Sequence, residues 1–289
     1  AVMAVTNFIP DLWSNKLLVA LRKAHVAGNL VNRDYEGEIK RQGDSVKITS
    51  INDVTIGTYT PHSDITVEDI DDATRSLLID QARYFAVELD DVEKAQYVKG
   101  GDSPLAQAVD NAAYQLADVA DAFLLDKIND AAEATSNDLG TVAIHTDADA
   151  LYDSIVDLMV RLDVSNVPQM GRFVVVSPSL HGRLLKLDRF VSTGDAVAAS
   201  TRTNGFIGEI VGLPVYKSNN LPAVTDAAAT GGLAIAGYRG AATFAEQIVS
   251  LEADRMEKRF ADMVKGLHVY GAAVIRTTGV AKVEFDATA

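Results

Sequence analysis

The stretch "SPLAQAVDNAAYQLADVADAFLLDKINDAAEA", Ser103–Ala134, predicts one long helix that sets the scale of the fold. Ser103 can cap the first turn, and Pro104 suits the first helical position. At about 1.5 Å per residue this helix is a rod of roughly 45 Å, longer than most globular helices. Apolar residues repeat along one face at helical spacing: Leu105, Val109, Ala112, Leu116, Val119, Phe123 and Ile128.

The opposite face of this helix carries acidic residues, which we expect to point into solvent. Lys127 is the single basic residue among them, so the predicted exposed face is anionic. The acidic positions are Asp110, Asp118, Asp121, Asp126 and Asp130.

Upstream of the helix, "GDSVKITSINDVTIGTYTP", Gly43–Pro61, predicts two strands joined near Asn52 into a hairpin. The apolar residues alternate with polar ones at Val46, Ile48, Val54 and Ile56. The alternation is dilute, and a lone two-stranded ribbon is marginally stable in water. The hairpin therefore needs a surface to rest on.

The rest of the chain mixes helix and strand, which indicates an α+β fold. Residues 75–89 alternate apolar and polar side chains and predict one strand with a solvated side. A helix is expected from about Asp147 to Asp163. Residues 172–187, "RFVVVSPSLHGRLLKL", predict a buried strand that leads through Ser177 into a helix. Further strands are expected at 209–218, 231–238 and 266–285, and a loop at 188–206.

Composition excludes several classes of function. The 289 residues are 48% hydrophobic and include no cysteine, which removes thiolate catalysis, disulfides and Cys-ligated zinc. Forty acidic residues against 26 basic ones give a net charge of -14, which argues against tight binding to nucleic acid. No apolar run reaches the roughly 18 residues of a membrane span. We therefore expect a protein of a reducing compartment with no membrane contact.

A search for catalytic motifs finds little chemistry. Phosphate-binding, zinc-protease, nucleophile-elbow and calcium-loop motifs are absent from the sequence. One enzymatic alternative remains, an α/β hydrolase that uses Ser177 or Ser179 with His181, although Ser177 is explained as well by a helix cap. The expectation is a non-enzymatic protein without cofactor or metal.

Several stretches resemble the major capsid proteins of tailed bacteriophages, in particular the P22 coat-protein-like group. The opening "FIPDLWSNKLLVALRKAHVAGNLVNRDYEGEI" is similar to the N-terminal arm of that group, and residues 43–96 resemble its extended loop and return strand. "GLPVYKSNNLP" and "RMEKRFADMVKGLHVYGAAVIR" resemble a turn-and-strand motif and the C-terminal strand region. The succession of these stretches, more than any one of them, carries the resemblance.

The resemblance implies the Hong Kong 97-like fold, with an arm, an extended loop, a peripheral domain with a spine helix, and an axial domain. The loop of such shells lies on the adjacent subunit, which would supply the surface that the ribbon lacks. The implied boundaries are 1–42 for the arm, 43–75 for the loop, 76–146 and 241–289 for the peripheral domain with its spine helix at 103–134, and 147–240 for the axial domain.

The implied function is a major capsid protein that self-assembles into hexamers and pentamers of an icosahedral phage head around double-stranded DNA. Implied partners are other copies of the chain, a separate scaffolding protein, a portal protein and decoration proteins. The chain would be a virion component assembled in the host cytoplasm. An encapsulin-like compartment that loads protein cargo is the alternative with the same fold.

A subunit interface is expected on the arm and on the loop. Trp13 lies on an apolar helical stripe in the arm, and the polar segment after it offers no evident anchor in its own subunit. Lys47 is a candidate donor for an isopeptide cross-link, which occurs in some relatives. The expected interface residues are Trp13, Leu17, Leu21, Val46, Lys47, Ile48, Val54, Ile56 and Tyr59.

Overall fold

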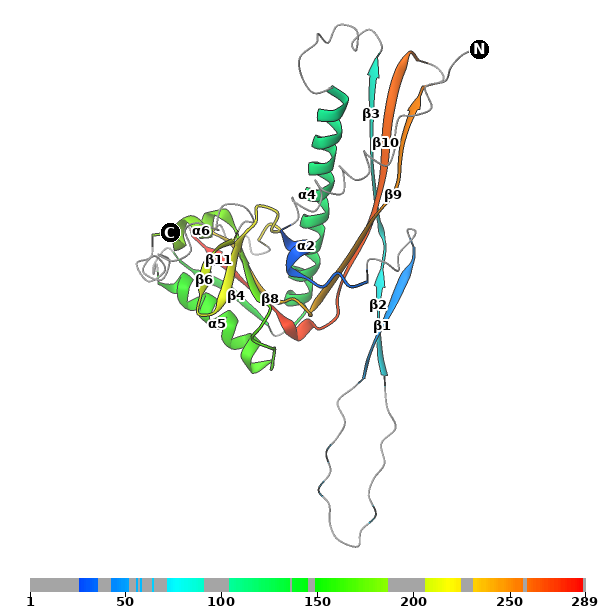
Figure 1. The fold of residues 1–289 in the computed structure, drawn as a ribbon. Coiled ribbons are helices and arrows are strands. Elements are labelled where there is room, and N and C mark those ends of the chain that lie inside the picture. The colour runs from blue at the N-terminus through cyan, green and yellow to red at the C-terminus, as the bar shows by residue number, and fades with distance from the viewer. Residues whose placement is uncertain are drawn as a thin grey trace.

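The computed structural model describes residues 26–35, 43–51, 56, 58, 64, 72–90, 104–135, 137–144, 149–186, 206–224, 231–256 and 259–287. Helix α4 (Pro104–Glu133) confirms the predicted long helix and forms the axis of the molecule. Figure 1 shows a six-stranded sheet on one side of its C-terminal half and a long three-stranded sheet on the other. The N-terminal half of α4 rises away from the six-stranded sheet and accompanies only the long sheet.

The six-stranded sheet is mixed and contains strands from distant parts of the chain. Strand β11 pairs in parallel with β4, and β5 pairs in parallel with β7, while the other neighbours are antiparallel. The order across the sheet is β4 (Asp138–Ala143), β11 (Val280–Asp286), β8 (Gly232–Tyr238), β5 (Arg172–Val176), β7 (Leu213–Lys217) and β6 (Phe206–Ile210).

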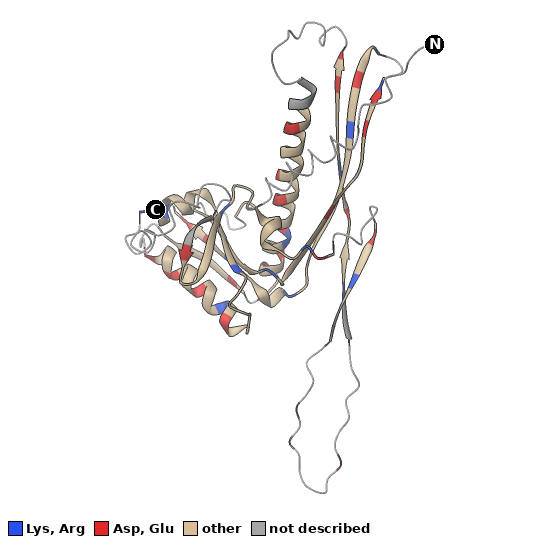
Figure 2. Cartoon of the chain, viewed as in Figure 1, with Lys and Arg blue, Asp and Glu red and all other residues tan. Residues whose placement is uncertain are grey.

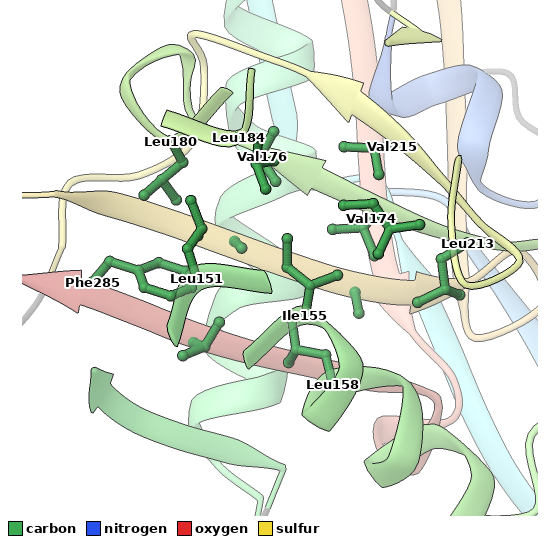
Figure 3. Close-up of a cluster of buried hydrophobic side chains, with 14 of the residues drawn as sticks. Leu151, Ile155, Leu158, Val174, Val176, Leu180, Leu184, Leu213, Val215 and Phe285 are labelled. Atoms are coloured by element: carbon green, nitrogen blue, oxygen red, sulfur yellow. The ribbon is translucent and has the colours of Figure 1, made fainter. Parts of the chain in front are cut away.

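Helices α5 (Ala150–Val164) and α6 (Pro178–Leu184), both of which the sequence predicted as helices, cover one face of this sheet. Leu151, Ile155 and Leu158 of α5 meet Val174 and Val176 in one buried cluster (Figure 3). The alternate residues of β5 point to the opposite face, toward α4. Both faces of β5 are therefore buried, which explains its continuous apolar run.

The long sheet has the order β3 (Gln81–Asp90), β10 (Ala261–Val274) and β9 (Ala242–Arg255). The sequence did not predict β9. Its register with β10 shifts between Leu267 and His268, and this shift changes which residues face α4. Phe244 and Ile248 face α4 before the shift and Leu251 faces it afterwards, so no period of two spans the strand.

The ribbon differs from the predicted hairpin. Strand β1 (Ser45–Ile51) pairs along its length with β2 (Asp72–Leu78), so its partner is not the segment around Val54 and Ile56. The predicted single strand over 75–89 is also wrong, because it divides at Ile79 into β2 and β3, which belong to different sheets. The Ile79 backbone N–H and C=O bond to residues 43 and 44 and close the ribbon there.

The base of the ribbon rests on its own subunit. Leu77 and Ile79 are fully buried and pack with Val46 against Ala245 and Val269 of the long sheet, on the face opposite α4. Gly271 permits this close approach, since a Cβ there would lie 2.3 Å from the carbonyl oxygen of Leu78. Ribbon, long sheet, α4, six-stranded sheet, and α5 with α6 thus form successive layers.

Two positions on α4 differ from the predicted helix faces. Val119, assigned to the apolar stripe, is 41% exposed, because this part of α4 is covered on one side only. Asp121, assigned to the solvated face, is 2% exposed. It accepts hydrogen bonds from the backbone N–H groups of Val26 and Ala27, at 3.2 and 2.7 Å.

The segment around α2 (Ala27–Leu30) has an anchor in its own subunit, which corrects the expectation that the polar stretch after the arm has none. Ala27, Leu30 and Val31 are buried in the cluster that includes α4. Asn32 extends the contact, because its N–H donates to Ala242 C=O and its C=O accepts from Phe244 N–H. Residues 26–34 therefore join α4 to the first residues of β9.

Candidate assembly interface

Ser177, Ser179 and His181 do not form a catalytic arrangement. The two hydroxyl oxygens are 2.9 Å apart, and Ser179 donates to the carbonyl of Gly231 at 2.6 Å. In the described part of the chain neither hydroxyl bonds to the His181 ring. Burial, with a smaller effect of Lys217, lowers the pKa of His181. A serine nucleophile needs its base within hydrogen-bond reach, so this geometry does not support the hydrolase alternative.

Metal sites and membrane spans are two further features that the described ranges could hold. Within them no group of three or more His, Asp or Glu side chains is placed to hold a metal ion. None of the helices found there is both long and apolar enough to cross a membrane.

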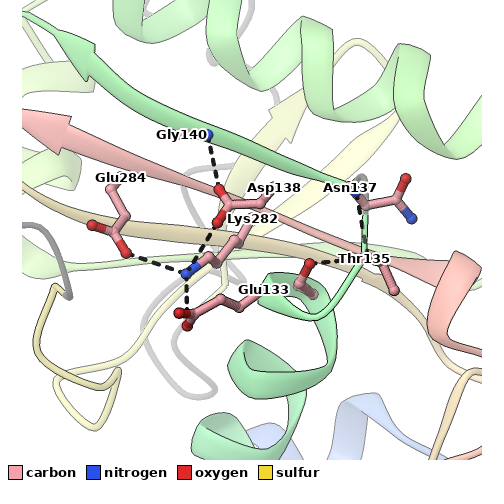
Figure 4. A network of polar contacts seen from close by, with 8 residues as sticks. Glu133, Thr135, Asn137, Asp138, Gly140, Lys282 and Glu284 are labelled. Carbon is pink, nitrogen blue, oxygen red and sulfur yellow. Dashed lines mark hydrogen bonds and ion pairs between the residues drawn. The ribbon is translucent and has the colours of Figure 1, made fainter.

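A buried cation fixes the joint between α4 and the six-stranded sheet. Lys282 of β11 is 1% exposed, and its Nζ lies 3.2 Å from Glu133, 3.3 Å from Asp138 and 3.3 Å from Glu284 (Figure 4). Burial lowers the pKa of Lys282, but these three carboxylates outweigh it and leave the pKa raised. Glu133 ends α4 and Asp138 begins β4, so one ammonium group holds both ends of the intervening turn.

Large apolar side chains are exposed at separated ends of the molecule. Phe260, in the turn between β9 and β10, is 79% exposed, and Ile56, between β1 and β2, is 95% exposed. Val164 ends α5 and Met170 lies in the turn after it, and both are exposed. Figure 1 places the β9–β10 turn, α5 and the ribbon far from one another. Such positions lie where a neighbouring molecule can reach them.

The region in which the N-terminal half of α4 packs only on the long sheet, called the long arm below, is thin. Val109, Ala113 and Leu116 of α4 pack on Phe85 and Val264 of the long sheet in a core one helix and one sheet thick. The outer face of this sheet carries ion pairs instead of an apolar layer: Lys265 with Glu252 at 2.7 Å and Arg259 with Glu88 at 2.8 Å. Because the long arm has so little depth, much of its length is exposed to partners.

The interface residues expected on the ribbon and the N-terminal arm fall into three groups: buried, exposed, and outside the described residues. Val46 is buried in its own subunit, and Ile48 packs partly against the same cluster. Lys47 and Ile56 are exposed. Trp13, Leu17, Leu21, Val54 and Tyr59 lie outside the described residues.

The exposed residues Phe260, Met170, Val160 and Val164 were not among the expected interface positions. A sequence signal existed for two of them. Val160 and Val164 are four residues apart on α5 and fall off the stripe of Leu151, Ile155 and Leu158, so they share the outward face. Phe260 follows two basic residues, Lys258 and Arg259, and nothing in that pattern distinguishes an exposed aromatic residue from a buried one.

Charge on the described surface is mainly acidic. Figure 2 shows acidic residues along α4 and α5 and on the long sheet, with few basic residues between them. Asp130 lies near the end of α4, where burial and then the neighbouring Asp126 raise the pKa of its carboxyl group. A surface of this kind repels phosphate groups at neutral pH.

Comparison with known proteins gives a family and a fold. The model of a family described as phage capsid protein matches residues 73–283. No curated protein matches the chain.

Solved structures resemble the chain over most of its length. One from Mycobacterium phage Che8 is 32% identical, with 89% of each chain covered and a TM-score of 0.70. The capsid structure of cyanophage P-SCSP1u is 16% identical, covers 92% of this chain and 88% of its own, and has a TM-score of 0.68. The capsid of Ralstonia phage GP4 is 14% identical, with 93% and 91% covered and a TM-score of 0.65.

Proposed function

The chain belongs to the family of phage capsid proteins, with the Hong Kong 97-like fold, and from this premise we propose that it builds an icosahedral phage head from hexamers and pentamers of itself. The observation that carries this proposal is that exposed apolar side chains lie at three separated places. These are the β9–β10 turn, the end of α5 and the segment between the two strands of the ribbon. A capsid subunit must contact several neighbours at once, and contacts at separated ends allow this.

The proposed division of the chain keeps the boundaries that the resemblance implies, although β4 and β11 share the six-stranded sheet with strands of residues 147–240. Residues 1–42 act as an arm and 43–75 as the extended loop. Residues 76–146 and 241–289 form the peripheral domain, with the spine helix at 103–134, and residues 147–240 form the axial domain. The exposed Lys47 and Ile56 support a loop that reaches a neighbouring subunit. Trp13, Leu17 and Leu21 of the arm, with Val54 and Tyr59 of the loop, are proposed as further contacts.

The proposed contents of the head are double-stranded DNA. A net charge of -14 suits a shell whose DNA moves during filling and ejection, because the protein does not hold phosphate tightly. Assembly is proposed to take place in the host cytoplasm with a separate scaffolding protein, a portal protein and decoration proteins. The protein's own role in this scheme is structural and not enzymatic.

The test of this function is electron microscopy of the expressed protein, with and without a scaffold. Closed shells, or tubes and sheets of hexamers, are expected. A monodisperse monomer that forms no particles at high concentration, even with scaffold, would contradict the proposal. Particles that carry an enzyme cargo in place of DNA would indicate a protein-loading compartment.

Replacing the segment between the two strands of the ribbon tests the proposed role of the extended loop. Residues 52–71 are exchanged for a Gly-Ser linker, and β1 and β2 are kept so that Leu77 and Ile79 stay buried. Thermal unfolding of the subunit should change little while the yield of shells collapses. Normal shells from this variant would contradict the proposed role of the loop.

Fluorescence tests the arm, because Trp13 is the one tryptophan. A blue shift and weaker acrylamide quenching are expected on assembly, since docking on a neighbour places the indole in an apolar contact. Identical spectra for subunits and shells would refute docking of Trp13.

A further inference from the structure

Asp121 is shared by two segments that lie far apart in the sequence. Its Oδ1 accepts from the N–H groups of Val26 and Ala27, and its Oδ2 accepts from the Nδ2 of Asn220 at 3.2 Å. Val26 and Ala27 begin α2, and Asn220 lies in the loop that follows β7. A carboxylate with 2% exposure therefore joins the N-terminal segment, α4 and the six-stranded-sheet region.

The Asn220 side chain uses both of its amide hydrogens on α4. Its Nδ2 also donates to Asp118 Oδ1 at 2.7 Å, and Asp118 precedes Asp121 by nearly one helical turn. The loop is shaped for this contact, because the Asn220 N–H donates to Ser218 Oγ and the Ser218 N–H donates to Val176 C=O. Asn220 thus links the six-stranded sheet to two successive acidic positions on α4.

The first N–H groups of any helix lack acceptors within the helix. For α2 the carboxylate of Asp121 supplies this acceptor from another element. A pocket beside it, lined by Val26, Tyr114, Asp118 and residues 217–220, gives solvent a route to the junction. If the carboxylate turns away, water can reach the N–H groups of Val26 and Ala27.

We propose that Asp121 is a latch that couples the N-terminal segment to the loop after β7. Asn220 holds the carboxylate in the orientation that presents Oδ1 to Val26 and Ala27, and these two N–H groups hold it toward Asn220. A buried carboxylate that loses one donor gains freedom to rotate and to bind water, so its hold on the other segment weakens. Loosening either segment therefore loosens the other.

This coupling goes beyond shell formation and does not depend on it. Within a shell, its consequence would be that a pull on the N-terminal segment changes how firmly the loop at residues 218–221 is held to α4. Both segments pack in one cluster around α4, where Leu221 lies with Leu30, so a change at the latch reaches the packing of both.

Amide hydrogen exchange on the unassembled subunit tests the latch. Asn220→Ala removes the donor without touching the N-terminal segment, and exchange at Val26 and Ala27 is expected to rise about fivefold or more. Asn219→Ala is the matched control, because Asn219 is exposed and its side chain makes no hydrogen bond to α4 in the described structure.

Asp118→Asn provides a second variant if Asn220→Ala does not fold. It weakens the hold on Asn220 and leaves the Asp121 carboxylate in place, so a smaller rise at Val26 and Ala27 is expected. Exchange at these amides that stays within twofold of the control in the folded variant would overturn the proposal. The experiment needs no particles, so its outcome is separate from that of the proposed capsid function.

Discussion

Replacing Lys282 by methionine should be among the most destabilising single changes in this chain. The substitution keeps a long unbranched side chain and replaces its charged end by an uncharged thioether. Lys282 is buried on β11, and three carboxylates lie within 3.3 Å of its Nζ. The variant leaves the buried carboxylate of Glu284 without this cation.

The expected loss follows from the burial of each carboxylate. Glu133 is half exposed and Asp138 is partly exposed, so water compensates much of their loss, as in surface pairs of about 0–1 kcal/mol. Glu284 is buried, and breaking a buried pair from one side costs about 3–5 kcal/mol. We therefore expect Lys282→Met to lower the free energy of unfolding by about 4 kcal/mol.

Urea unfolding of the unassembled subunit at pH 7, followed by circular dichroism, measures this loss. Glu133→Gln is the matched control and should cost about 1 kcal/mol or less. The double variant Lys282→Met, Glu284→Met should recover most of the stability, because an apolar pair of similar volume replaces a buried ion pair. A single variant that costs less than the Glu133→Gln control, or a double variant as unstable as the single one, would refute the reasoning.

The wild-type protein and the Lys282→Met variant also give a test by pH dependence. The pKa of Lys282 is raised in the folded state, so its stabilising effect is complete below the unfolded pKa of about 10.4 and is lost as pH rises through the folded value. The difference in stability between wild type and Lys282→Met should stay constant from pH 7 to about pH 10 and shrink above it. A difference that shrinks below pH 9 would contradict this assignment.

Three further changes test other features. Gly271→Ala should cost about 1–3 kcal/mol in thermal unfolding, because its Cβ would meet the carbonyl oxygen of Leu78 at 2.3 Å. Gly182→Ala is the control and should not destabilise, because a Cβ there meets open space. Equal effects of the two substitutions would contradict the close approach at Gly271. Phe260→Ala should change subunit stability by about 0.5 kcal/mol or less, since Phe260 is 79% exposed. The yield of shells in electron microscopy should fall, and a normal yield would remove Phe260 from the interface. Arg172→Met should cost about 2 kcal/mol in urea unfolding, because the buried guanidinium bonds to the Pro168 carbonyl and pairs with Asp163; an unchanged midpoint would refute that role.

Elements defined by local periodicity could be predicted from the sequence. The repeat from Val109 to Ile128 predicts α4, and the apolar run 173–176 predicts a strand buried on both faces. The resemblance to phage capsid proteins, drawn from the order of several stretches, is confirmed by the family match over residues 73–283. These signals lie within short windows or in the succession of motifs.

Features that depend on distant pairing could not be predicted in this way. Strand β1 pairs with β2 across the intervening residues 52–71, while the local pattern favoured the nearer segment around Val54. The burial of Asp121 depends on backbone groups 94 and 95 residues away. In the sequence it looks like any other aspartate on an acidic helix face, and only the position of α2 distinguishes it.

Strand order in the six-stranded sheet also has a consequence for synthesis. Strand β11 lies between β4 and β8, although the ribosome makes it after both of them. Because β4 has β11 as its neighbour in this sheet, it cannot join until residues 280–286 have left the exit tunnel. Chains that stop before Val280 would lack the buried Val283 and Phe285 and would leave β4 and β8 unpaired on that side. Late translation of this interior strand therefore delays completion of the subunit, and a chain that stops before it cannot add β4 to the sheet.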